Sequence, residues 1–426
     1  MRTGVAYNLV GAAFNQGSTL LVNLAVANLL GREIFGRYTM LLVTVGSLAA
    51  LGQLSMGYTA TKYVAEFRVI EPAKASRILG LCAIVSGAAG LIAACALAVL
   101  APWLAGPILG ASELAPELRI IAAAVFFTVA NGFMTGALAG LESYRTLARA
   151  GVASGTIYAL LCTVSAWAYG LTGAVAGVTV SALAQCVILA AMLLRESARQ
   201  GVPLTCRGLS QERAVLLHFA LPTSLGALVS QPALWVASAL LARQMGGYQQ
   251  LALFGAANTF RAMVLFVPQA INNVGMSLLN NQRRSSAQGY RDVFWMNAAL
   301  TALVAVGTAG VLFLAGGPLL RMFGPDFADG RLVLGLMLGA AVVEAMAVAA
   351  YQIVVSRGRI WPSLMLVTAP RDVTLVVLAA MLTPSFGAAG LATAYGAAWI
   401  LALLGIVVLV VGPRLAESRA ASAWIR

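Results

Sequence analysis

Long apolar runs separated by short polar turns constrain this chain more than any other feature of its sequence. A helix of about 20 apolar residues spans the ~30 Å hydrocarbon layer of a bilayer, and a helix satisfies its own backbone hydrogen bonds where no water is present. The pattern therefore predicts an all-α polytopic membrane protein with twelve transmembrane helices. The twelve runs cover residues 8–30, 39–60, 78–100, 119–141, 150–170, 173–194, 214–241, 251–280, 293–315, 331–355, 362–383 and 388–411.

The composition excludes the main classes of soluble protein. Of the 426 residues, 61% are apolar and 10% are charged, whereas soluble proteins average roughly 45–50% and 25%. This balance argues against a soluble enzyme, a secreted disulfide scaffold and a nucleic-acid-binding domain. The five cysteines show no C-x-x-C spacing and His218 is the single histidine, so we expect neither a metal site nor a cofactor.

The Arg and Lys residues predict the orientation in the membrane. If the N-terminus is cytoplasmic, 19 of the 27 basic residues fall on the cytoplasmic side, 6 fall in outer turns and 2 lie inside spans. Basic residues concentrate in the cytoplasmic loops of membrane proteins. We therefore expect both termini in the cytoplasm, and the net charge of +13 needs no polyanionic partner.

Weak internal similarity indicates two halves. The turns that contain Gly173 and Gly387 carry similar small residues at an offset of 214. An even number of helices per half keeps the two halves parallel, and parallel repeats place a substrate site between them. We therefore expect two six-helix halves, residues 1–200 and 205–426, related by a pseudo-two-fold axis along the membrane normal.

Polar side chains gather on one face of the span 8–30 and on one face of the span 251–280, when each is drawn at 100° per residue. Interhelical hydrogen bonds would explain such a stripe, but the number of polar groups favours a hydrophilic cavity. The candidate substrate-binding amides are Asn15, Gln16, Asn23, Asn258, Gln269 and Asn272.

Four charged residues lie inside spans of the second half, namely Arg261, Glu344, Arg371 and Asp372. Arg371 and Asp372 are adjacent and diverge by 100° on a helix, so we expect them to have different partners; Glu344–Arg371 and Arg261–Asp372 are alternative pairings. Arg261 and Arg371 are candidate phosphate ligands, and Glu344 and Asp372 are candidates for ion coupling. Ion pairs that merely hold helices together are the alternative.

The turn after the first span carries the most specific stretch of sequence. Residues 30–38 read Leu-Gly-Arg-Glu-Ile-Phe-Gly-Arg-Tyr, and Lys62-Tyr63-Val64-Ala65-Glu66 follows the segment from Gly52 to Gly57. These stretches resemble the first two helices of bacterial oligosaccharide flippases, which are the O-antigen and exopolysaccharide flippases of the polysaccharide transporter family. That family belongs to the multidrug/oligosaccharidyl-lipid/polysaccharide exporter superfamily.

The resemblance implies a V-shaped bundle with a central cavity, in which alternating access moves undecaprenyl-diphosphate-linked oligosaccharide to the outer leaflet of the bacterial inner membrane. Such transport serves the biosynthesis of O-antigen, capsule or exopolysaccharide, in contact with polysaccharide polymerase or ligase machinery. Arg261, with Arg371, would meet the diphosphate, and the amides would bind sugar hydroxyls. We expect an ion gradient to drive transport, because the sequence contains no G-K-[ST] phosphate-binding motif.

Two alternatives stay open. A small-molecule or drug extruder of the same superfamily would have the same fold, although a cation exporter would favour acids inside the spans of the first half. A membrane polymerase or ligase of glycans would need large outer loops with catalytic residues. The outer turns here are short and show no paired carboxylates or nucleophile–base arrangement, so we expect a transporter and not an enzyme.

Overall fold

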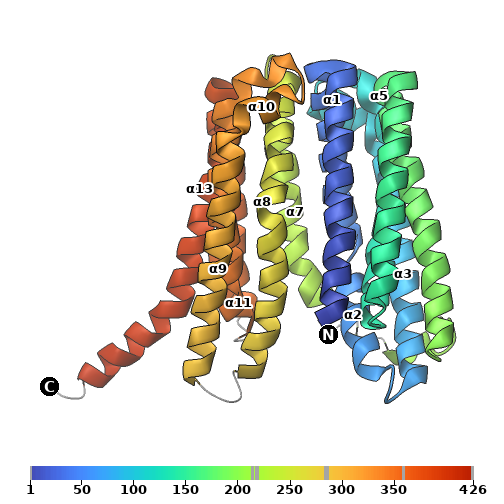
Figure 1. Cartoon of the computed structure of the whole chain (residues 1–426), viewed down its shortest axis with the longest axis vertical. Helices are drawn as coiled ribbons and strands as arrows, with labels where there is room; N and C mark the ends of the chain where they lie inside the picture. Colours follow the sequence, from blue (N-terminus) through green and yellow to red (C-terminus); the bar gives the residue numbers. More distant parts are fainter. Residues whose placement is uncertain (1, 213–214, 216–219, 283–286, 357–359, 424–426) are drawn as a thin grey trace. The chain divides into compact units, whose positions relative to one another are not determined.

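The computed structural model describes residues 2–212, 215, 220–282, 287–356 and 360–423, and His218 lies outside these ranges. The described residues are overwhelmingly helical and contain no strand. They form two compact units, Met1–Trp235 and Val236–Arg426. Figure 1 shows that each unit is a bundle of long helices running side by side.

The first unit contains five long or medium helices and the start of a sixth. Short 3-10 and π-helical turns connect some of them, including the π-helical turn Leu104–Ile108 directly after α3. The helix α7 crosses from the first unit into the second. The helices are α1 (Arg2–Gly52), α2 (Met56–Phe67), α3 (Pro72–Trp103), α4 (Ala115–Gly140), α5 (Tyr144–Arg199) and α7 (Leu221–Ala242).

The second unit repeats this plan with longer connections at one end. A π-helical turn, Leu364–Thr368, leads directly into its last helix, and the 3-10 turn Pro325–Gly330 leads into α11. The helices are α8 (Gly247–Gln282), α9 (Ala287–Leu314), α10 (Gly316–Arg321), α11 (Arg331–Ser356), α12 (Ile360–Ser363) and α13 (Ala369–Ala423).

The described helices confirm the twelve predicted spans. Eight helical segments are long and apolar enough to cross a membrane. Three of them, α1, α5 and α13, have 51, 56 and 55 residues, about twice what a ~30 Å layer requires at 1.5 Å per residue. Each of these is interrupted by a non-helical glycine, Gly31, Gly170 or Gly387, and so supplies two spans. The shorter apolar helix α7 completes the twelve.

The backbone corrects the register of the internal repeat. Gly170 (φ 63°, ψ −138°) and Gly387 (φ 53°, ψ −128°) adopt nearly the same left-handed conformation, which favours glycine. Three residues later, a Cβ on Gly173 would overlap the Ser165 carbonyl oxygen, and a Cβ on Gly390 would overlap the carbonyl oxygen of Leu382. The equivalent glycines are thus 217 residues apart, not 214. The predicted boundary between residues 200 and 205 stays a prediction.

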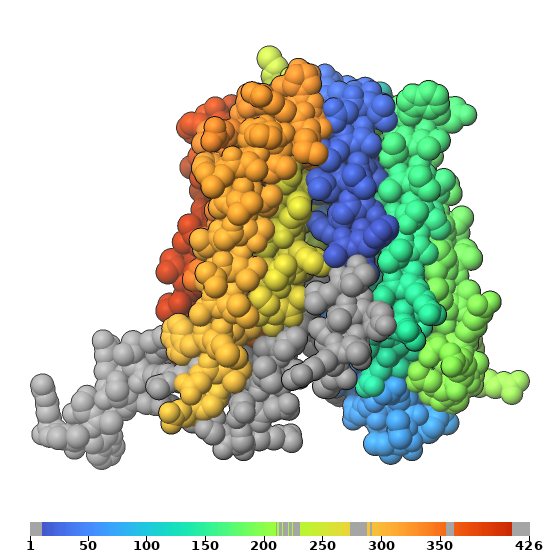
Figure 2. All heavy atoms as spheres, viewed as in Figure 1, coloured from blue at the N-terminus to red at the C-terminus, as the bar shows by residue number. Residues whose placement is uncertain are grey.

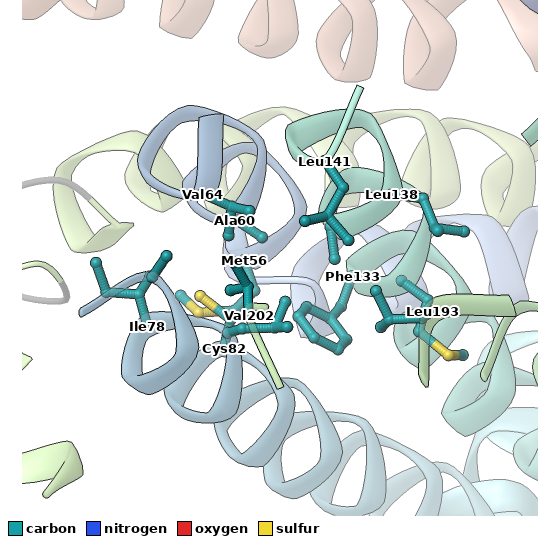
Figure 3. Packing of buried hydrophobic residues seen from close by; sticks show 14 of the residues in the cluster. Met56, Ala60, Val64, Ile78, Cys82, Phe133, Leu138, Leu141, Leu193 and Val202 are labelled. Carbon is teal, nitrogen blue, oxygen red and sulfur yellow. The ribbon is translucent and has the colours of Figure 1, made fainter. Parts of the chain in front are cut away.

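The first unit has an apolar core around α2. Met56, Ala60 and Val64 of α2 pack against side chains of α3, α4 and α5 and against Val202, which follows α5 (Figure 3). Val202 is completely buried, and Glu212 further along the same segment pairs with Arg77 of α3 at 2.8 Å. The segment that leads towards α7 is therefore attached to the first unit as far as Glu212.

The outer faces of the helices are suited to lipid. Along α9, which runs on the visible face of the second unit (Figure 2), exposed side chains include Trp295, Leu300, Leu303, Val306 and Leu314. A soluble protein rarely exposes so large an apolar stripe. The exposed apolar side chains and the span lengths together make the chain a membrane protein, as its composition predicts.

Candidate functional site

The charged residues inside the spans meet in the second unit, where α8, α11 and α13 pack together. Arg261 lies 14 residues after the start of α8 at Gly247, and Glu344 lies 13 residues after the start of α11 at Arg331. At 1.5 Å per residue both positions are about 20 Å from the helix start. Each is therefore deep inside a span, where an ionisable side chain needs a partner.

Arg261 and Glu344 form an ion pair that Tyr395 of α13 completes. The Arg261 Nη1 atom lies 2.5 Å from Glu344 Oε2 and donates to the Tyr395 hydroxyl oxygen at 2.8 Å. The Tyr395 hydroxyl in turn donates to the same Glu344 Oε2 at 2.9 Å. Three helices thus contribute one side chain each to a closed ring of hydrogen bonds, which we call the Arg261 triad (Arg261, Glu344 and Tyr395).

The triad is largely shielded from solvent, with 15% of the Arg261 side chain and 11% of the Glu344 side chain exposed. Its position is fixed further by Asn258, one turn earlier in α8, whose Oδ1 accepts a hydrogen bond of 2.8 Å from Arg261 Nε. Within the described residues Arg261 Nη2 makes no hydrogen bond. A buried ion pair is tolerated when its remaining polar atoms are satisfied, and here one guanidinium edge is left for another acceptor.

The predicted pairings Glu344–Arg371 and Arg261–Asp372 are both wrong. Arg371 instead pairs with its neighbour Asp372: Arg371 Nη2 and Nε lie 2.7 and 2.8 Å from Asp372 Oδ1. The 100° divergence applies to the Cβ directions, but the long Arg371 side chain reaches back across it. Asp372 Oδ2 is buried and accepts no hydrogen bond from a described residue.

Two aromatic rings of α13 connect the two ion pairs. The Arg261 guanidinium carbon lies 5.1 Å from the centre of the Tyr395 ring, and the Arg371 guanidinium carbon lies 4.7 Å from the centre of the Trp399 ring. The two rings face each other edge to face at 6.4 Å. Both cations are therefore within the range of cation–π attraction, and the two ion pairs belong to one continuous cluster.

Asn272, also in α8, belongs to a separate polar network. Its Oδ1 accepts hydrogen bonds from Asn297 Nδ2 at 3.0 Å and from Thr301 Oγ1 at 3.4 Å, both on α9. Its backbone carbonyl accepts a bond of 2.8 Å from Gln352 Nε2 of α11. These contacts join three helices, which is the interhelical bonding that polar groups provide in membrane bundles.

The other predicted amides differ in exposure. Asn15 and Gln269 are exposed, Gln16 is half-buried and Asn23 is buried. The polar face of the first span therefore changes from open near Asn15 to enclosed near Asn23. Asn15 and Gln16 belong to the first unit and Gln269 to the second.

Tyr395, Trp399 and Gln352 were missed as site residues from the sequence. Tyr395 and Trp399 count as apolar in a hydropathy pattern, and their polar role appears only once α13 packs beside α8. The spacing of four residues that places both rings on one face of α13 was a usable signal. In the first unit, Glu117 was assigned to an outer turn, but it is buried and accepts a hydrogen bond of 2.8 Å from Thr172.

Among the described residues, no three His, Cys, Asp or Glu side chains come together to hold a metal ion. The cluster therefore offers arginine cations and shielded carboxylates as its chemical groups. Such groups bind an anion with two acceptor oxygens, because the guanidinium donates two parallel hydrogen bonds. They also bind or release a proton when a carboxylate loses its cation.

Comparisons with known proteins agree with this architecture. The pattern of the family described as polysaccharide biosynthesis protein matches residues 1–278. The EPS I polysaccharide export inner membrane protein EpsE of Ralstonia solanacearum is 23% identical over 199 residues, which cover 46% of this chain and 45% of that protein. The chain thus matches less than half the length of this relative.

Solved structures of similar fold cover nearly the whole chain. An inward-facing multidrug resistance MATE family transporter of the MOP superfamily has a TM-score of 0.76 at 16% identity, over 97% of this chain and 99% of the other. A MOP superfamily transporter from Pyrococcus furiosus has a TM-score of 0.67 at 18% identity, over 99% and 95% of the two chains. At these identities the comparison establishes the MOP transporter fold.

Proposed function

This chain belongs to the polysaccharide biosynthesis protein family, and from that premise we propose that it flips an undecaprenyl-diphosphate-linked oligosaccharide from the cytoplasmic to the outer leaflet. The family match, the relative named as a polysaccharide export inner membrane protein and the MOP transporter fold support a transporter for polysaccharide biosynthesis. The lipid-linked substrate, the direction and the energy source are the proposed part.

The Arg261 triad is the single observation that carries this proposal. A lipid-linked glycan crosses the membrane with a diphosphate group, which needs a cation inside the hydrocarbon layer. Arg261 supplies a permanent positive charge deep in a span, and its Nη2 edge makes no hydrogen bond within the described residues. Arg371 in the same cluster would offer a second guanidinium to a ligand with two phosphates.

The amide side chains would contact the sugars. Asn15, Gln16 and Gln269 are exposed or half-buried, so they could donate to and accept from sugar hydroxyls, while the polyprenyl chain stays in lipid. Asn258 would act indirectly, because it already holds Arg261 Nε. Asn23 is buried beyond Gln16, and Asn272 would keep its helix contacts.

Energy coupling would use the carboxylates of the cluster. When the diphosphate engages Arg261 or Arg371, Glu344 or Asp372 loses part of its cation and becomes a site for a proton. The buried Asp372 Oδ2, which lacks a donor among the described residues, supports this role. We place the chain in the bacterial inner membrane with both termini in the cytoplasm.

The direct test is flipping of a fluorescent lipid-linked oligosaccharide by the purified protein in vesicles, with and without an imposed pH gradient. Flipping by the wild type and its loss in Arg261→Ala, at equal protein incorporation, are the expected results. Full flipping by Arg261→Ala would show that the diphosphate does not bind at Arg261.

Export of a small molecule is the second candidate, and the likeness to a multidrug resistance MATE family transporter favours it. A cation exporter needs an acid that is free to bind a cation. Glu344 is already paired with Arg261, which favours the anionic lipid-linked substrate. Drug-sensitivity tests on a deletion strain, set beside analysis of its surface polysaccharide, separate the two functions.

A further inference from the structure

The hydrogen bonds of Arg261 show that its binding position for an anion is already occupied. Nη1 contacts both the Glu344 carboxylate and the Tyr395 hydroxyl, and Nε is held by Asn258. Only the Nη2 edge is left within the described residues. A bidentate phosphate needs two adjacent N–H groups of one guanidinium, so it cannot bind Arg261 fully while Glu344 keeps its place.

The charges of the triad lead to the same conclusion. Arg261 carries one positive charge and Glu344 one negative charge, 2.5 Å apart at their closest atoms, so the pair offers little net attraction to an anion. Because Glu344 is part of the same folded unit, it competes with the advantage of an intramolecular ligand. A ligand with several charges and several acceptor oxygens is best able to displace it.

We propose that Glu344, positioned by Tyr395, is an internal competitor for Arg261 that sets the selectivity of the site for diphosphate over singly charged or monophosphate ligands. This inference rests on the proposed function only for the identity of the natural substrate. Tyr395 donates to the same Glu344 oxygen that Arg261 contacts, so it stabilises the occupied state. Removing either competitor group should make Arg261 easier to reach and the site less selective.

A purely orienting role for Glu344 makes the opposite prediction. If the carboxylate only held the guanidinium in a binding geometry, then its removal would weaken anion binding. The two roles therefore differ in the sign of the effect.

The experiment measures binding of inorganic diphosphate and inorganic phosphate to the full chain in lipid nanodiscs by isothermal titration calorimetry. Glu344→Gln keeps the shape of the side chain and removes its charge. Tyr395→Phe removes one hydroxyl and changes no charge. Glu117→Gln is the matched control, because it neutralises a buried acid of the first unit that contacts Thr172 and lies outside the triad.

We expect Glu344→Gln to bind diphosphate at least about tenfold more tightly, equivalent to ~1.4 kcal/mol, and to bind monophosphate measurably, so that the ratio of the two affinities falls. Tyr395→Phe should shift both affinities in the same direction by about two- to fivefold, and Glu117→Gln should match the wild type. Arg261→Gln should abolish the binding.

Equal or weaker diphosphate binding by Glu344→Gln would overturn the proposal. If that variant does not fold, weaker binding by Tyr395→Phe overturns it, and tighter binding supports it. Diphosphate binding that survives Arg261→Gln would reject both this inference and the proposed phosphate site. Tighter binding by Glu344→Gln, combined with no flipping of lipid-linked oligosaccharide by the wild type, would support the competitor and reject the proposed function.

Discussion

Replacing Arg261 with Met should reveal how much the Arg261–Glu344 pair contributes to folding. Removing one partner of a buried ion pair costs about 3–5 kcal/mol in soluble proteins. Polar interactions inside membranes are weaker on average, and Tyr395 would still donate to Glu344. We therefore expect Arg261→Met, and likewise Glu344→Met, to lower the free energy of unfolding by about 2 kcal/mol each.

The double variant should be more stable than either single one. With both charges gone, two Met side chains fill the space without a buried unpaired charge, and replacement of a buried pair by apolar residues is often nearly neutral. We expect a total loss of about 1 kcal/mol, which gives a coupling energy of about 3 kcal/mol in the double-mutant cycle. Equilibrium unfolding by SDS in mixed micelles, followed by tryptophan fluorescence, measures all four proteins.

The neighbouring pair of Arg371 and Asp372 provides the contrast. These residues are adjacent in α13, so their contact can persist when the helix separates from α8 and α11 in the denatured state. The same cycle with Arg371→Met and Asp372→Met should give a coupling energy below about 1 kcal/mol. If the coupling of Arg261 with Glu344 were equally small, then the ion pair between α8 and α11 would not exist in the membrane.

Three further changes test other parts of the structure. Gly173→Ala should lower the unfolding free energy by more than about 2 kcal/mol, because its Cβ would overlap the Ser165 carbonyl oxygen, whereas Gly17→Ala, with nothing within 4 Å of the added Cβ, should stabilise or leave it unchanged in the same SDS titration. Asn272→Leu should cost about 1–2 kcal/mol, since it leaves the Asn297 amide without its acceptor; an unchanged unfolding curve would contradict the network. Cys206 is exposed in the segment after α5, so a membrane-impermeant maleimide should label it from the cytoplasmic side alone, and labelling from outside would reverse the predicted orientation.

The helices could be predicted because their signal is local. Each span needs about 20 apolar residues, and the turns at Gly31, Gly170 and Gly387 interrupt the runs where the hydropathy pattern ends them. The register of the repeat was harder to assign, because short stretches of Gly, Ala and Thr match one another at several offsets. Only the left-handed backbone at Gly170 and Gly387 identified the equivalent pair.

The site was predictable in its composition but not in its contacts. Hydropathy identified Arg261, Glu344, Arg371 and Asp372 as costly inside spans, and all four do lie in one cluster. Their pairing depends on the reach of flexible side chains and on the packing of α8, α11 and α13, which periodicity within one helix does not contain. For the same reason, Tyr395 entered the site only through its contact with residues 134 and 51 positions away.

The pairing of these charges links the choice of substrate to which partner leaves. In the closed triad the charges of Arg261 and Glu344 cancel, so neither an anion nor a cation is strongly attracted. A ligand that takes Arg261 must be anionic and frees an acid, whereas a ligand that takes Glu344 must be cationic and frees an arginine. The Tyr395 hydroxyl favours the first exchange, because it can continue to donate to Glu344 after Arg261 has moved, while an arginine that lost Glu344 would keep only neutral acceptors. The geometry of the triad therefore favours an anionic substrate over a cationic drug.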